Sequence, residues 1–110
     1  KTVMLTYVRL YNRLMVQNLD KEQQQLYEWI DKLLWEEWDP IGVNDIPEAR
    51  DEYQSYTPRL FNLAMEGATT EVIAQELFQI EMHTMGLFGS RQRCELIAQK
   101  IADQAKNSLG

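Results

Sequence analysis

The sequence is poor in cysteine, histidine and proline, with one cysteine, one histidine and three prolines among 110 residues. The single cysteine, Cys94, excludes an intramolecular disulfide and a thiolate metal cluster, and it leaves open only a bridge between two chains. The five glycines are scattered, so the chain has no glycine-rich phosphate-binding loop. These absences fit a protein of the reducing cytoplasm that uses no cofactor.

His83 is the only histidine, and Ile80 stands three residues before it, so the Glu-x-x-His pairs of di-metal bundles are absent. Glu76 and Gln79 share a helix flank with His83. One imidazole, one amide and one carboxylate make a poor ligand set for a metal ion. We therefore predict no metal, no catalytic residue and no enzyme. The alternative is a small enzyme or metal-binding protein that uses His83 and the nearby carboxylates.

Hydrophobic residues make up 45% of the chain and aromatic residues 10%. This is too apolar for a disordered chain and sufficient for a single hydrophobic core, so we predict one domain over residues 1–110. The N-terminal apolar run is interrupted by Arg9, Asn12 and Arg13 before it reaches the length of a signal peptide core or a membrane span. We expect a soluble, cytoplasmic protein without a membrane partner.

The net charge of −6 is unevenly distributed. Residues 20–53 contain eleven acidic and three basic side chains, whereas residues 1–19 contain three basic side chains and no acidic one. A strongly negative middle argues against a nucleic-acid ligand, because phosphate binding requires clustered lysine and arginine. It favours a basic protein partner. The alternative is that these acids only keep the protein soluble.

Apolar residues recur at helical spacing along most of the chain, which predicts an all-α protein. Residues 3–14 combine this spacing with the β-branched and aromatic content of a strand, and we predict a helix there. Asp20, with Gln23 three residues later, forms a capping-box pattern that begins the clearest helix. A helix is predicted to end at Gly67, and Thr69 and Ser90 are predicted to cap the starts of the two helices that follow. The predicted architecture is a single compact bundle of four to five helices.

Residues 38–53, WDPIGVNDIPEARDEY, are expected to form a corner between the second and third helices. Pro40 disfavours a helical conformation at Asp39, so one helix should end there, and Pro47 suits the first turn of the next helix. We predict that this next helix continues through Pro58 with a kink. The apolar side chains of the corner are expected to fold back as a plug. The predicted structural residues of the corner are Trp38, Pro40, Ile41, Val43, Pro47 and Tyr53.

Helical periodicity places Trp35 about 140° from the main apolar stripe, among charged residues. An exposed indole of this size needs a cover. The N-terminal helix would supply one through Arg9 and Arg13, or a binding partner would supply it instead. On the second hypothesis, the partner-binding residues are Trp35, Glu28, Asp31, Asp39, Asp45 and Asp51.

The string EEWDPIGV, followed by DIPEA and DEY, resembles the YugE-like family of small uncharacterised bacterial domains over about residues 26–86. This resemblance implies an all-α fold and a bacterial, cytoplasmic origin, and it implies no activity. Small acidic helical proteins are also similar in size and charge to immunity proteins of bacterial toxin systems. We therefore expect a non-enzymatic protein-binding module, an immunity or inhibitor protein whose acidic surface covers a basic toxin or effector. A homodimer is left open.

Overall fold

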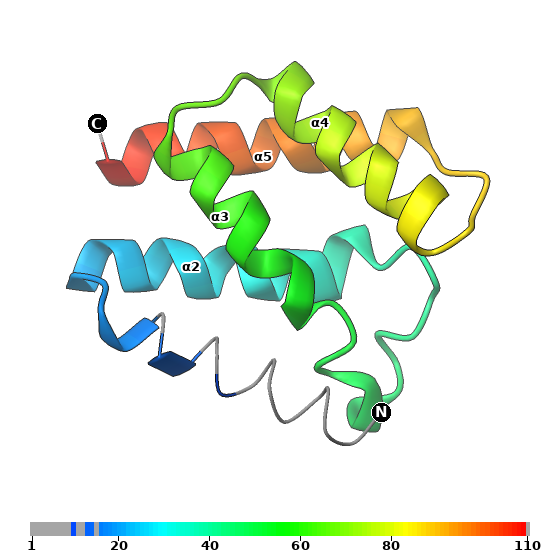
Figure 1. Cartoon of the computed structure of the whole chain (residues 1–110), viewed down its shortest axis with the longest axis horizontal. Helices are drawn as coiled ribbons and strands as arrows, with labels where there is room; N and C mark the ends of the chain where they lie inside the picture. Colours follow the sequence, from blue (N-terminus) through cyan, green and yellow to red (C-terminus); the bar gives the residue numbers. More distant parts are fainter. Residues whose placement is uncertain (1–9, 11–12, 15, 110) are drawn as a thin grey trace.

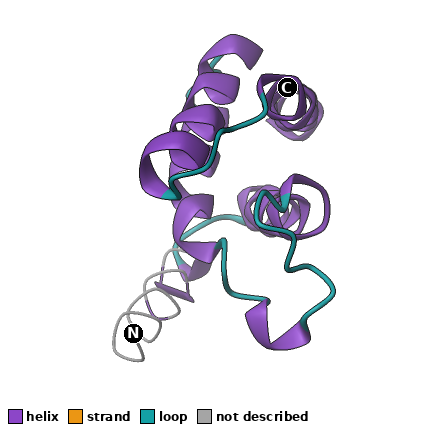
Figure 2. Cartoon of the chain, turned by 90° about the vertical axis from the view of Figure 1, so that its right-hand side faces the viewer, coloured by secondary structure: helices purple, strands orange, loops and turns teal. Residues whose placement is uncertain are grey.

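The computed structural model of the chain describes residues 10, 13, 14 and 16–109. This part contains four α-helices, which are α2 (Lys21–Leu33), α3 (Thr57–Met65), α4 (Thr70–Gln79) and α5 (Arg91–Leu109). Its shorter elements are the π-helical turns η1 (Leu34–Trp38) and η4 (Ile80–Thr84) and the 3₁₀ turns η2 (Pro47–Ala49) and η3 (Gln54–Tyr56). No described residue belongs to a strand (Figure 2), which confirms the predicted all-α fold. The predicted N-terminal helix over residues 3–14 lies almost wholly outside the described residues.

The four helices pack around one core. Figure 1 shows α2 and α5 running in opposite directions, one above the other, with α3 crossing them and α4 lying along α5. The core contains large aliphatic side chains from all four helices, among them Leu26, Ile30, Leu60, Ile73, Leu77 and Ile101. None of the helices in the described ranges combines the length and the apolar character that crossing a membrane requires.

The helix starts follow the capping signals in the sequence. The Asp20 carboxylate accepts a hydrogen bond from the backbone N–H of Gln23 at 2.8 Å, and the Gln23 side chain accepts one from the backbone N–H of Asp20 at 3.0 Å. The hydroxyl groups of Thr69 and Ser90 each accept a bond of 3.3 Å from the backbone N–H three residues later. All three predicted caps are therefore confirmed, and each satisfies N–H groups that a helix start leaves without a partner.

The end of α3 also follows its sequence. Gly67 has φ +74°, a left-handed conformation that glycine adopts without steric cost. Its N–H donates to the carbonyl of Ala64 at 3.1 Å, and the next N–H, of Ala68, donates to the carbonyl of Leu63 at 3.0 Å. This pair of bonds is the Schellman motif, and it confirms the predicted helix end.

The prediction of one kinked helix through Pro58 is wrong. Residues 47–56 contain two separate 3₁₀ turns, and α3 begins at Thr57 with Pro58 in its first turn. Proline has no N–H and a fixed φ, so it is well suited to a first turn, whereas in a helix interior it costs about 3 kcal/mol. The connection into α3 is therefore longer than expected and runs through residues 39–56.

The substitution Pro58→Ala tests this placement. Removing a proline from a helix interior would stabilise the protein by about 3 kcal/mol. Removing a proline from a first turn only gives the unfolded chain more conformational freedom. We therefore expect Pro58→Ala to lower the free energy of unfolding by up to about 1 kcal/mol. Chemical denaturation of both proteins measures the difference, and a gain in stability would contradict the first-turn placement.

Candidate functional site

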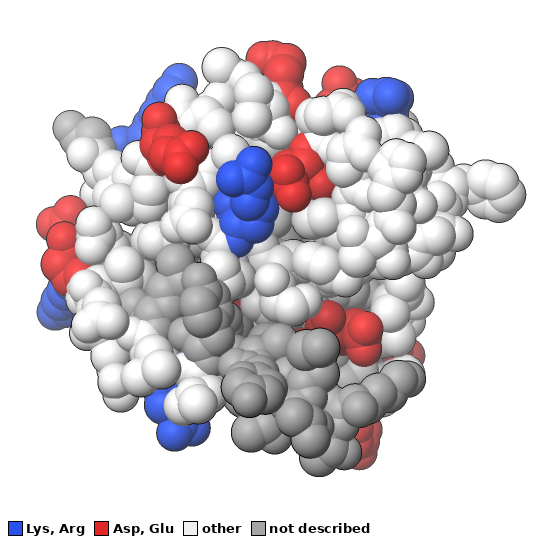
Figure 3. All heavy atoms as spheres, in the orientation of Figure 1, with Lys and Arg blue, Asp and Glu red and all other residues white. Residues whose placement is uncertain are grey.

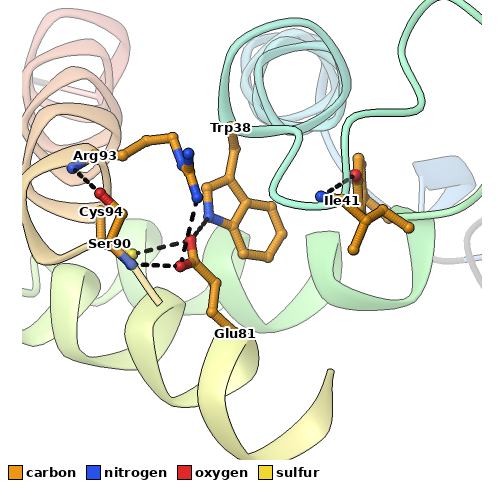
Figure 4. A network of polar contacts seen from close by, with 7 residues as sticks. Trp38, Ile41, Glu81, Ser90, Arg93 and Cys94 are labelled. Carbon is orange, nitrogen blue, oxygen red and sulfur yellow. Dashed lines mark hydrogen bonds and ion pairs between the residues drawn. The ribbon is translucent and has the colours of Figure 1, made fainter. Parts of the chain in front are cut away.

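The site is built around a buried carboxylate. Glu81, in η4, has a fully buried side chain, and Nε1 of Trp38 donates to its Oε2 at 2.7 Å (Figure 4). The backbone N–H of Ser90 donates to Oε1 at 2.8 Å, and the guanidinium group of Arg93 lies 3.6 Å from the same oxygen. Both carboxylate oxygens thus have partners, as a buried charge requires.

Two π-helical turns bring the indole and the carboxylate together. The turns η1 and η4 follow α2 and α4 directly, and each is closed by a backbone hydrogen bond that spans five residues, of 3.0 and 2.9 Å. The additional residue in a π turn changes the direction of the side chains that follow, and such turns are frequent at functional sites. Because Trp38 ends η1 and Glu81 lies in η4, their hydrogen bond joins the ends of two helices.

Glu81 is not among the residues that the sequence singles out, because an isolated glutamate near a helix end is typical of a solvent-facing position. A signal exists nevertheless. Glu81 follows Leu77 by four residues and Ile73 by eight, and both of these are fully buried. Residues at this spacing share a helix face, so Glu81 falls on the buried face of α4.

A second carboxylate fixes the corner from inside. Asp39 adopts a left-handed conformation with φ +33°, and its Oδ1 accepts hydrogen bonds from the Tyr53 hydroxyl at 2.7 Å and from the backbone N–H of Val43 at 2.9 Å. Its Oδ2 accepts one from the backbone N–H of Asn44 at 3.2 Å. Burial and the Asp39 carboxylate raise the pKa of Tyr53, which keeps the phenol protonated as a donor. Asp39 therefore stabilises the loop from within by accepting these hydrogen bonds, as aspartate often does in turns.

The structure corrects the expected exposure of Trp35. Its side chain is only 9% exposed, because the corner folds back over it. The guanidinium group of Arg50 lies 5.6 Å from the Trp35 ring centroid, and the Tyr53 ring centroid is 6.3 Å away. Arg50 also pairs with Asp31 at 2.9 Å, and the other oxygen of Asp31 accepts a hydrogen bond from Thr57 at 2.9 Å. Trp35 and Asp31 thus make internal contacts, and neither is presented to a partner.

The other predicted residues divide by exposure. Glu28 and Asp45 are exposed, and Asp51 is half-buried. Of the two arginines expected to cover Trp35, Arg9 lies outside the described residues and Arg13 is exposed. Of the predicted structural residues of the corner, Trp38 and Tyr53 are buried, Pro40 and Val43 are half-buried, and Ile41 and Pro47 are exposed.

The outer side of the corner is both apolar and acidic. Ile41 and Ile46 are 41% and 46% exposed, so these two residues do not belong to the plug. Asp45, Glu48 and Glu52 are exposed, and none of them makes an ion pair with another described residue. We call these five residues the corner surface.

Elsewhere the charges are mixed. On the face shown in Figure 3, acidic and basic side chains lie interspersed. Some acids have basic partners: the half-buried Glu76 pairs with Arg59 at 3.5 Å, and the exposed Glu37 pairs with Lys100. The acidic middle of the sequence is therefore not one continuous acidic face, and the corner surface is one of the places where carboxylates without an ion pair adjoin exposed apolar side chains.

The groups that could carry chemistry are poorly placed for it. The thiol of Cys94 is buried, and its Sγ lies 3.2 Å from Oε2 of Glu81. Burial, together with Glu81, raises the pKa of Cys94 to about 12, so the nucleophilic thiolate is scarce at neutral pH. His83 is exposed, and within the described ranges no three His, Cys, Asp or Glu side chains gather as a metal site.

Comparison of the chain with protein-family models, with curated proteins and with solved structures finds no match. The resemblance to the YugE-like family stays a prediction. The function is therefore argued from the site itself, from the buried Glu81, the corner that it positions and the surface that the corner exposes.

Two substitutions of Trp38 separate its packing from its hydrogen bond. Trp38→Ala removes a buried indole, and we expect it to lower the free energy of unfolding by about 3 to 5 kcal/mol. Trp38→Phe keeps much of the volume but takes the indole donor from Glu81, and we expect a loss of about 1 to 3 kcal/mol. Denaturant titration measures both values. If Trp38→Phe proves as stable as the unaltered protein, the hydrogen bond contributes nothing to stability.

The thiol chemistry gives a further prediction. Because burial and Glu81 raise the pKa of Cys94 to about 12, the native thiol should react with a disulfide reagent at pH 8 about a hundredfold more slowly than an exposed thiol. The matched control carries Cys94→Ala and Ser55→Cys, which moves the only thiol to an exposed position. Similar reaction rates for the two folded proteins would show that Cys94 is accessible and activated.

Proposed function

We propose that this chain is a non-enzymatic protein-binding module whose corner surface binds a basic protein domain. The observation that carries the proposal is the presence of two exposed isoleucines beside three carboxylates that make no ion pair in the described part of the chain. Apolar anchors that lose their water supply affinity, and complementary charge supplies association rate and selectivity. The corner surface offers both kinds of contact in one place.

The corner is also held in one conformation, which favours binding. Asp39 and Tyr53 join the two halves of the loop, and the backbone N–H of Ile41 donates to the Tyr53 hydroxyl at 3.2 Å. Trp38 anchors the start of the loop to Glu81. A surface that is ordered before binding loses less conformational entropy when it binds.

The class of partner is inferred from the negative charge of the chain and of its corner surface. In the proposal, the partner is a basic toxin or effector domain of bacterial origin, and the chain is the immunity or inhibitor protein that covers it. The net charge of −6 and the unpaired carboxylates at the corner support a basic partner. The free, buried Cys94 fits a protein that acts in a reducing cytoplasm.

The test removes charge at the corner while keeping the size of the side chains. The variant Asp45→Asn, Glu48→Gln, Glu52→Gln is used beside the unaltered protein to capture partners from the native host. We expect the unaltered protein to retain a protein of net positive charge, and the corner variant to lose it. The affinity for that protein, measured by titration calorimetry, should fall at least about tenfold, because each lost contact of about 1.4 kcal/mol costs that factor.

The matched control removes three exposed acids elsewhere, as Glu22→Gln, Glu66→Gln and Glu95→Gln. It changes the net charge by the same amount and leaves the corner intact, so it should retain the partner. Equal losses in both variants would mean that only net charge matters. Full binding by the corner variant would contradict the proposed site.

A further inference from the structure

A phenylalanine stands fully in solvent on the loop that follows η4. The side chain of Phe88 is 100% exposed, and residues 85–90 form the loop between η4 and α5. We call these residues the Phe88 loop. An exposed aromatic ring of this size is costly in water and is a frequent anchor of protein interfaces.

The exposure of Phe88 does not come from a loosely held backbone. Both of its flanks are tied to Glu81: the N–H of Leu87 donates to the Glu81 carbonyl at 2.8 Å, and the N–H of Ser90 donates to its carboxylate at 2.8 Å. Gly89, with φ +82°, lies so close to Phe78 that a Cβ atom there would come within 2.7 Å of the Phe78 ring. The backbone of the Phe88 loop thus packs against Phe78 of α4, while the Phe88 ring points into solvent.

The surroundings of Phe88 differ in charge from the rest of the chain. Residues 82–93 contain no acidic side chain and two arginines, although the whole chain has a net charge of −6. Arg91 is exposed and its guanidinium group lies 4.2 Å from the Phe78 ring centroid, while the Arg93 side chain is 39% exposed. Arg93 already pairs with Glu81, so the Phe88 loop is an apolar projection beside one exposed basic side chain, that of Arg91.

The chain itself carries the complementary surface. The corner surface has exposed isoleucines that suit an aromatic ring and unpaired carboxylates that suit arginine. Figures 1 and 2 place the Phe88 loop and the corner at the same end of the molecule, and both are anchored to Glu81, the corner through Trp38. Within one copy they do not meet, because Phe88 is fully exposed.

We infer that two copies of this chain associate about a two-fold axis, so that Phe88 of each copy packs against Ile41 and Ile46 of the other. Arg91 then faces the carboxylates of Asp45 and Glu48. When two complementary surfaces lie at the same end of a molecule, a two-fold rotation forms both contacts together. This dimer and the proposed basic partner use the same corner surface, so each excludes the other. The dimer is tested on the purified chain alone, so its failure leaves the proposed function standing.

Sedimentation equilibrium of the purified full chain over a range of concentrations measures the association. We expect a reversible dimer, and we expect Phe88→Ser to weaken it at least about tenfold. The fully exposed Phe88 contributes no packing to the fold, so this variant should keep its melting temperature. Leu96→Ser, which replaces another exposed apolar residue on α5, is the matched control and should dimerise normally.

Mixing two defective variants identifies the surfaces that meet. The first variant carries Phe88→Ser and keeps its corner, and the second carries Asp45→Lys and Glu48→Lys and keeps its Phe88 loop. Alone, each should dimerise at least about tenfold more weakly than the unaltered chain. In the mixture, the intact loop of the second meets the intact corner of the first, so one of the two contacts is restored and heterodimers should appear.

Three results would overturn the inference. The first is a chain that stays monomeric up to about millimolar concentration, which means a dissociation constant weaker than about 1 mM. The second is a dimer that Phe88→Ser leaves unchanged. The third is a dimer that Phe88→Ser weakens without any recovery in the mixture, which would place Phe88 on a different surface of the second copy. If a monomeric chain binds phosphatidylglycerol vesicles through Phe88, the ring serves a membrane surface instead, and the dimer is likewise excluded.

Discussion

The hydrogen bond of 2.7 Å between the Trp38 indole and the Glu81 carboxylate is the interaction on which the arrangement of the corner and of the Phe88 loop depends. Trp38 is the first residue of the corner, and Glu81 also holds the Phe88 loop and the start of α5 through Ser90. Three segments that are distant in sequence therefore take their positions from one side chain. Burying a single carboxylate costs several kcal/mol, and the donors around Glu81 offset this cost.

An apolar side chain at position 81 would fill the same space without fixing the same geometry. Dispersion contacts are not directional, so an aliphatic group would leave the indole N–H of Trp38 and the backbone N–H of Ser90 without an acceptor. The two π-helical turns make this directionality important, because each changes the direction of its side chains relative to the α-helix before it. The charge thus contributes specificity of arrangement more than stability.

The sequence predicts the parts of this fold that depend on local contacts. The caps at Asp20, Thr69 and Ser90 and the glycine end of α3 are confirmed, because each depends on residues three to five positions apart. The π turns and the cover of Trp35 could not be predicted in this way. The cover of Trp35 depends on a contact between residues in different segments, that of Arg50 with the Trp35 ring, and each π turn departs from the α-helical spacing on which the prediction relied. The fold class was therefore accessible from the sequence, and the arrangement of the site was not.

The acidic residues also have to be divided by their place in the fold, because their number alone does not say which carboxylates are exposed at the surface. Asp39 and Glu81 are used inside the molecule, where they accept hydrogen bonds that position the corner and the Phe88 loop. Asp45 and Glu48 make no ion pair with a described residue and stand in solvent on the structure that the internal acids hold in place. All four count equally toward a net charge of −6. Only the second pair is available to a positive charge from outside, so the electrostatic field outside the corner arises from the acids that folding leaves unpaired.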